Sequence, residues 1–141
     1  MSDIVVDSCV VAKWVLPEPD TDKAERLLTQ AKSAGNRLMV VDIVLPEVAN
    51  AIWKRQRRGL TTREEAQRLL DAIGRFPVSQ QPAAPLLAAA FEIAVKYDRS
   101  VYDALFVALA RKLGVRGVTA DEPLFNAIKG DFPQIVLLRH L

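Results

Sequence analysis

Four acidic residues stand near the starts of predicted helices: Asp7, Glu47, Asp103 and Asp121. Asp7 and Asp121 also directly follow predicted strands. Carboxylates within a few ångströms of one another raise each other's pKa unless a cation neutralises them. Oxygen ligands without histidine or cysteine favour Mg²⁺ or Mn²⁺ over zinc. If the four acids meet, the pattern predicts a divalent-metal site that can activate water against a phosphodiester.

Each of these acids also has a purely structural explanation. Asp7 and Asp121 can cap the helices that follow them. Glu47 lies in a first helical turn, where the helix dipole favours an anion. Ser100 and Asp103 match a capping box. The metal-site hypothesis therefore depends on the four acids meeting in the fold.

Other polar residues lie beside these acids. Ser8 and Thr119 can hydrogen-bond to carboxylates or to metal-bound water, although Ser8 also suits the cap of the short helix after the first strand, and Thr119 a strand-end hydroxyl. Asp42 is interpreted as a helix cap and Asp98 as a turn residue.

Other chemistries find little support in the sequence. The one histidine, His140, is the penultimate residue and is expected at the surface. The one cysteine, Cys9, falls in a short apolar helix and is interpreted as a core residue. A glycine-rich phosphate loop does not occur, which argues against nucleotide hydrolysis.

The elements that must position the acids alternate along the chain. Helical patterns lie between the predicted strands, and the second strand is followed by a hairpin of two helices that carries Glu47 on its first arm. Short runs predict strands near residues 4–6, 38–41, 77–81, 117–119 and 135–138.

This alternation predicts an α/β fold in a single domain, residues 1–141. We expect a three-layer α/β/α sandwich with a central, mostly parallel sheet of five strands. Helix N-termini gather at the carboxyl edge of such a sheet, so acids far apart in sequence can converge there.

A basic run, Lys54, Arg55, Arg57 and Arg58, closes the helix that Glu47 begins. The net charge of +2 is too small to indicate nucleic-acid binding by itself. Glu47 and Lys54 are seven residues apart, which places them on one helix face, so cations can lead away from the acids and contact RNA phosphates. The alternative is an ordinary solvated helix end.

Composition predicts a globular protein, with 50% hydrophobic and 26% charged residues among 141. We expect no signal peptide and no membrane span, and a cytoplasmic location that suits a lone cysteine. The apolar residues Leu86, Leu87, Ala90, Phe91 and Ala94 exceed one packing stripe, which indicates either a deeply buried helix or a homodimer interface.

Four blocks together resemble a known family. They are residues 5–8 (VVDS, followed by Lys13 and Trp14), 45–51 (LPEVANA), 101–105 (VYDAL) and 118–121 (VTAD). In this order the chain is similar to a PIN domain, and more narrowly to the VapC toxins of bacterial toxin–antitoxin pairs.

The resemblance implies a Mg²⁺- or Mn²⁺-dependent endoribonuclease, commonly a homodimer, silenced by a VapB-like antitoxin whose C-terminal segment enters the active-site groove. It makes the four acids the catalytic, metal-binding quartet, with Ser8 and Thr119 as supporting hydroxyls. Some relatives carry two acids near the tip of the fourth strand, whereas this chain offers Glu122 or Asn126 beside Asp121.

Two other classes of function remain open. A PIN-like module could keep the acids as caps and only bind RNA or protein. A phosphotransfer receiver would need a second acid beside Asp7, where Ser8 and Cys9 stand, which makes this class the less favoured one.

Overall fold

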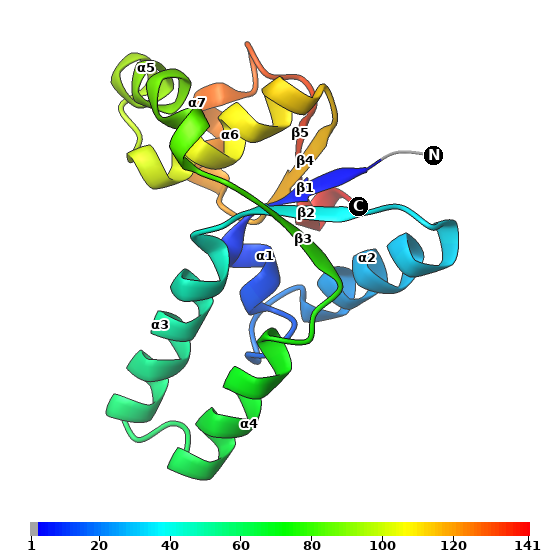
Figure 1. Cartoon of the computed structure of the whole chain (residues 1–141), viewed down its shortest axis with the longest axis vertical. Coiled ribbons are helices and arrows are strands. Elements are labelled where there is room, and N and C mark those ends of the chain that lie inside the picture. Colours follow the sequence, from blue (N-terminus) through cyan, green and yellow to red (C-terminus); the bar gives the residue numbers. More distant parts are fainter. Residues whose placement is uncertain (1–2) are drawn as a thin grey trace.

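A five-stranded, all-parallel sheet forms the centre of the molecule in the computed structural model, which describes residues 3–141 (Figure 1). The strand order is β3-β2-β1-β4-β5. The predicted five-stranded parallel sheet is therefore confirmed. The strands are β1 (Ile4–Val6), β2 (Leu38–Val41), β3 (Val78–Gln81), β4 (Arg116–Thr119) and β5 (Ile135–Leu137).

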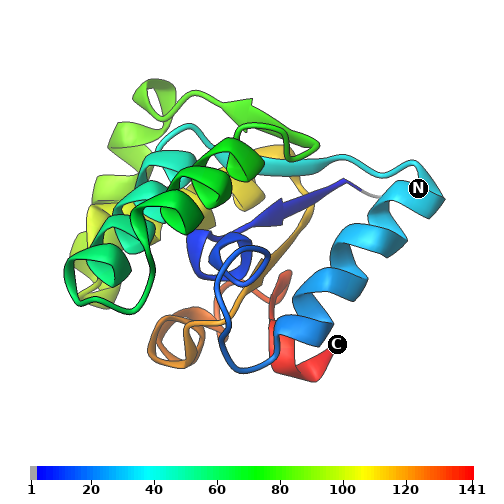
Figure 2. The same cartoon turned by 90° about the horizontal axis from the view of Figure 1, so that it is seen from below.

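Helices cover both faces of the sheet, which completes the predicted three layers (Figures 1 and 2). One face carries the fifth, sixth and seventh α-helices, and the other carries the first four. The helices are α1 (Ser8–Ala12), α2 (Thr21–Ala34), α3 (Val44–Arg57), α4 (Arg63–Ile73), α5 (Leu87–Tyr97), α6 (Val101–Leu113) and α7 (Glu122–Ile128), with short 3₁₀ turns at Ala84–Leu86 and Leu138–His140.

Strand β1 explains why the sheet is buried on both sides. Its side chains alternate, so Ile4 and Val6 pack into the core beneath α1 to α4 while Val5 packs into the core beneath α5 to α7. All three residues are buried. Because both faces of β1 are buried, all three of its residues are β-branched and apolar, without the alternation of polar and apolar residues seen in half-exposed strands.

The position of β1 also fixes where a site can form. From β1 the chain adds β2 and β3 on one side, then returns to add β4 and β5 on the other. The connections therefore diverge at the carboxyl ends of β1 and β4, and such a switch point leaves a crevice there. Asp7 follows β1 directly, and Thr119 is the last residue of β4.

The sequence offered both Asp7 and Ser8 as the cap of α1, and it predicted Asp42 as a helix cap, which is wrong. Asp7, not Ser8, caps α1, because its carboxylate accepts the Ser8 N–H. Asp42 does not cap α3: its N–H still continues the sheet ladder to Gln81, and its carboxylate turns to accept the Ala83 N–H at 3.1 Å. Asp42 therefore ties β2 to the segment after β3.

The hairpin of α3 and α4 projects beyond the sheet (Figure 1). The Thr62 hydroxyl accepts the Glu65 N–H at 3.1 Å, as the predicted capping box requires. Along residues 3–141, the structure contains no helix with the length and apolar character needed to cross a membrane.

Candidate active site

Asp7 is held at the tip of β1 by donors from two other elements. Its side chain is buried, with the residue only 8% exposed. One carboxylate oxygen accepts the Ser8 N–H of α1 at 2.9 Å, and the other accepts the Thr119 hydroxyl of β4 at 2.8 Å. Burial nevertheless prevails over these hydrogen bonds and, with the nearby charge of Asp103, raises the pKa of Asp7 to about 6.

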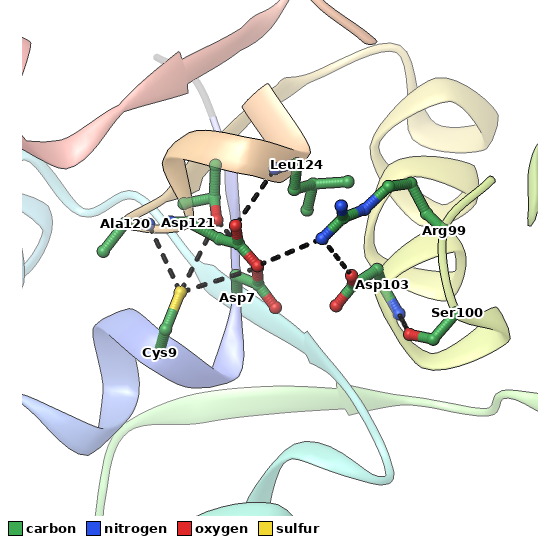
Figure 3. A network of polar contacts seen from close by, with 9 residues as sticks. Asp7, Cys9, Arg99, Ser100, Asp103, Ala120, Asp121 and Leu124 are labelled. Atoms are coloured by element: carbon green, nitrogen blue, oxygen red, sulfur yellow. Dashed lines mark hydrogen bonds and ion pairs between the residues drawn. The ribbon is translucent and has the colours of Figure 1, made fainter. Parts of the chain in front are cut away.

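Cys9 extends this network. Its Sγ lies 3.6 Å from a carboxylate oxygen of Asp7, to which it donates, and it accepts the Ala120 N–H at 3.2 Å (Figure 3). Burial and the Asp7 charge raise the pKa of the thiol to about 12, so the thiol stays neutral. The interpretation of Cys9 as a core residue missed this contact, because nothing in the sequence sets the direction of its side chain.

Glu47 and Asp103 approach Asp7 from the starts of α3 and α6. The Glu47 pKa rises to about 7, first because its carboxyl group is partly shielded from water, then because the charges of Asp7 and Asp103 lie nearby; the Ser8 side chain acts in the opposite direction. The carboxylates of three elements therefore interact electrostatically at one edge of the sheet.

Asp121 caps α7, since its carboxylate accepts the Leu124 N–H at 3.0 Å. Its own N–H bonds to the Thr119 hydroxyl at 3.1 Å, which joins it to the Asp7 network. The Ser100 hydroxyl accepts the Asp103 N–H at 3.1 Å, so that half of the predicted capping box also forms. Asp121 therefore caps a helix and also belongs to the acidic cluster, so the structural explanation and the metal-site hypothesis do not exclude each other.

Arg99 was not predicted and lies within the acidic cluster. Its guanidinium is 3.2 Å from the Asp103 carboxylate and 3.8 Å from that of Asp121 (Figure 3). Its side chain is 26% exposed. Arg99 precedes the N-cap Ser100 and lies outside α6, so the rule for helical residues four apart does not account for its contact with Asp103. Neither this contact nor the ion pair with Asp121 was foreseeable from sequence.

The chemistry of the acids fits a hard divalent cation. Asp7, Glu47 and Asp103 offer only oxygen atoms, and their charges disfavour one another without a cation. The arrangement is not yet a coordination shell, because no three Asp, Glu, His or Cys side chains of residues 3–141 are placed to hold one ion. The Arg99 guanidinium engages Asp103 and Asp121 instead.

A groove of about 310 Å³ lies between α1 and α3, and Glu47 is the one acid of the cluster that lines it. Glu47 and Lys54 both line it, as their spacing predicts. The predicted basic group does not act as one strip, since Arg57 lies over the Trp53 ring at 4.8 Å and Arg55 lines a separate hollow beside Leu60. Of the four predicted basic residues, Lys54 is the one that lines the same groove as Glu47.

A second groove of about 460 Å³ lies between the residue that ends α1, Lys13, and the start of α7. It is lined by Asp121, Glu122 and the largely buried Lys13, among others. Glu122 forms an ion pair with Arg139 there. Asn126, the other residue considered beside Asp121, is exposed on α7.

Comparison with known proteins places this geometry in a family. The family model "PIN domain" matches residues 4–130. The protein named Ribonuclease VapC3 from Pyrobaculum aerophilum is 37% identical over 135 residues, which cover 94% of this chain and 97% of that protein.

Solved structures share the fold at lower identity. The crystal structure of PAE2754 from Pyrobaculum aerophilum superposes with a TM-score of 0.74 at 20% identity, covering 99% of this chain and 85% of that one. VapBC2 from Rickettsia felis, solved bound to a DNA fragment from its promoter, gives 0.66 at 16% identity, covering 95% and 96%. The family match over most of the length shows that the chain belongs to the PIN domain family.

Proposed function

We propose that this protein is a Mg²⁺- or Mn²⁺-dependent endoribonuclease that acts as the toxin of a VapBC-type pair. The observation that carries the proposal is the convergence of Asp7, Glu47 and Asp103 from three elements, where burial and then the neighbouring carboxylate charges raise the pKa values of Asp7 and Glu47. Such a set favours a divalent cation. The 37% identity to a protein named as a ribonuclease supports RNA as the substrate.

In this proposal Asp7, Glu47 and Asp103 hold the ion, and Asp121 completes or tunes its surroundings. A divalent ion bound there supplies water activation and charge stabilisation on the phosphodiester. Ser8 and Thr119 keep the Asp7 carboxylate in place through hydrogen bonds. Above about pH 7, Asp7 and Glu47 are both ionised and able to act as ligands.

The groove beside Glu47 suits a single RNA strand. Lys54 lines this groove and carries a positive charge suited to a backbone phosphate. Contacts of this kind position RNA without reading its sequence. The other basic residues of α3, Arg55, Arg57 and Arg58, would contribute through the wider positive field at the helix end.

The variant Asp7→Asn tests the assignment, because an amide keeps the size of the side chain but not its charge. With a random-sequence RNA pool and Mn²⁺, cleavage by the variant should fall by about 100-fold or more. Asp22→Asn, which changes an exposed acid on α2, is the matched control and should cut normally. Undiminished cleavage by Asp7→Asn would overturn the proposal.

A second candidate is a PIN-like module that binds RNA or protein without cutting. The observation in its favour is that Arg99 already neutralises part of the acidic cluster. Mn²⁺ titration separates the two functions, because a metal site raises the melting temperature with ligand concentration. A binding module would show no Mn²⁺-dependent rise and no cleavage.

The proposed protein partner is a VapB-like antitoxin. Support comes from the likeness in fold to VapBC2 and to a structure from Klebsiella pneumoniae that is named a toxin–antitoxin complex. The groove between α1 and α3 opens beside the acids, so a segment of the antitoxin that entered it would block RNA from the same site.

A further inference from the structure

Arg99 is the only cation that the described residues bring into ion-pair contact with the candidate metal ligands. It lies in the turn between α5 and α6, and its Nη2 atom contacts acids that belong to two different helices. The Nε atom is buried and has no hydrogen-bond partner in the described part of the chain. Both ion pairs of the guanidinium therefore use Nη2, while the buried Nε–H is left without an acceptor among the described residues.

The Arg99 ion pairs reduce the electrostatic repulsion among the acids when no metal ion is bound. Four carboxylates at one sheet edge repel one another, and a single guanidinium bridging two of them reduces that repulsion. The Arg99 guanidinium contacts Oδ2 of Asp103, so a divalent ion that binds this carboxylate comes close to a positive charge. Because the two cations repel each other, binding of a divalent ion at Asp103 competes with the Arg99 ion pair.

We propose that Arg99 is a built-in counter-ion that the divalent cation replaces. By holding Asp103 and Asp121 together, Arg99 stabilises the metal-free fold and lowers the affinity of the site for metal. Arg99 is thus a positioning residue that sets the metal concentration at which the site fills. This inference rests on the proposed metal site.

The test compares Arg99→Gln with Arg99→Lys and with Arg26→Gln, which breaks an exposed Arg–Asp pair of the same spacing on α2. Melting temperatures in EDTA report the metal-free fold, and calorimetric titration with Mn²⁺ reports affinity without RNA or cleavage. Arg99→Gln should melt roughly 3 to 6 °C lower in EDTA. It should bind Mn²⁺ about tenfold more tightly, because a repelling charge is gone.

The two control variants fix the interpretation. Arg99→Lys keeps the charge, so its Mn²⁺ affinity should stay near that of the unchanged protein, and Arg26→Gln should match the unchanged protein in Mn²⁺ affinity. Equal or weaker Mn²⁺ binding by Arg99→Gln would overturn the inference while leaving the metal site intact. No Mn²⁺ binding by any variant or by the unchanged protein would refute the metal site itself, and the inference with it.

A measurement on the unchanged protein covers the case in which Arg99→Gln does not fold. The side-chain Nε resonance of Arg99, identified by its loss in Arg99→Lys, should shift when Mg²⁺ is added. A resonance that stays fixed at saturating Mg²⁺ would contradict replacement of the ion pair.

Discussion

At the scale of single residues, Asp7 shows two opposing influences on one carboxylate. Donors from Ser8 and Thr119 favour the charged form, whereas burial and the charge of Asp103 disfavour it. Burial prevails, and the pKa rises to about 6. A carboxylate held this way is costly to the metal-free fold and suited to a cation.

The first prediction concerns the stability of the metal-free protein. Since the Asp7 pKa is higher in the folded than in the unfolded state, the folded state binds more protons between about pH 4 and 6. The free energy of unfolding should therefore fall as pH rises through this window, by on the order of 2 kcal/mol from Asp7. Urea unfolding in EDTA at about pH 4 and about pH 7.5, which bracket the window, measures the difference.

Two variants check the cause of this pH dependence. Asp7→Asn should reduce it. Asp3→Asn should not, because Arg37 lowers the pKa of Asp3 and moves its contribution below this range. A pH dependence that Asp7→Asn leaves unchanged would assign the effect to other groups.

Residue types and their places in the chain were enough to predict the acidic positions. Asp7, Glu47 and Asp103 follow from strand ends and helix starts, which the fold gathers at one edge. Arg99 and Cys9 could not be assigned in this way. Their contacts depend on how a turn and a short helix direct their side chains toward residues far away in sequence.

At the scale of elements, α3 links the acids to the surface that RNA would contact. The helix presents Glu47 and Lys54 to one groove, while Arg57 packs over Trp53. The heptad spacing of the first two residues predicts the shared groove. The run of cations around them did not predict which residues would share it, because neighbours in sequence point to different sides of a helix.

The second prediction follows from this division of α3. In an Asp7→Asn background that prevents cleavage, Lys54→Ala should weaken RNA binding and reduce the slope of log affinity against log salt by about 0.7 to 1. Arg57→Ala should change the slope less, since its guanidinium is engaged with Trp53. Fluorescence anisotropy with labelled RNA over a KCl series measures both slopes. Equal slopes for Lys54→Ala and the parent would remove Lys54 from the RNA contact.

Helix caps were the most predictable local feature. Thr62 and Ser100 accept the N–H groups expected of them, because capping depends on residues only three apart. Asp42 shows the limit of this reasoning. Asp42 directly follows β2, and its side chain bonds to the segment after the adjacent strand β3. The sequence does not say which strands are adjacent in the sheet, so this bond could not be predicted.

At the scale of the whole molecule, α5 leaves an apolar stripe uncovered in the single chain. Leu87, Phe91 and Val95 are 51%, 62% and 69% exposed and recur at intervals of four residues. Leu86 and Ala90, from the same predicted set, are buried instead. The stripe is therefore additional to the internal face of α5, which favours the homodimer interface over the deeply buried helix that the sequence also allowed.

The third prediction tests this assembly. Phe91→Glu places a charge in the centre of the stripe and should convert a dimer into a monomer, with the melting temperature of the monomeric fold retained. Glu92→Lys on the same helix changes the charge of an exposed residue outside the stripe, and serves as the charge control. Sedimentation velocity reads the mass directly. A monomer in the unchanged protein at high concentration would exclude the dimer.

The layered architecture could be predicted from the alternation of strands and helices, whereas the strand order could not. Strand β1 is central because the chain returns past it after β3 and adds β4 on its other side. Nothing in the sequence marks this return. That return creates the crevice beside Asp7. The site is therefore a property of the topology as much as of its residues.

The most direct test of the proposed metal site is a crystal structure of the protein soaked in Mn²⁺, recorded with anomalous scattering. The account predicts one anomalous peak or more contacted by the carboxylates of Asp7, Glu47 and Asp103, with the Arg99 guanidinium withdrawn from Asp103. An acidic cluster that stays without an anomalous peak at saturating Mn²⁺, in a protein that still cuts RNA, would contradict it.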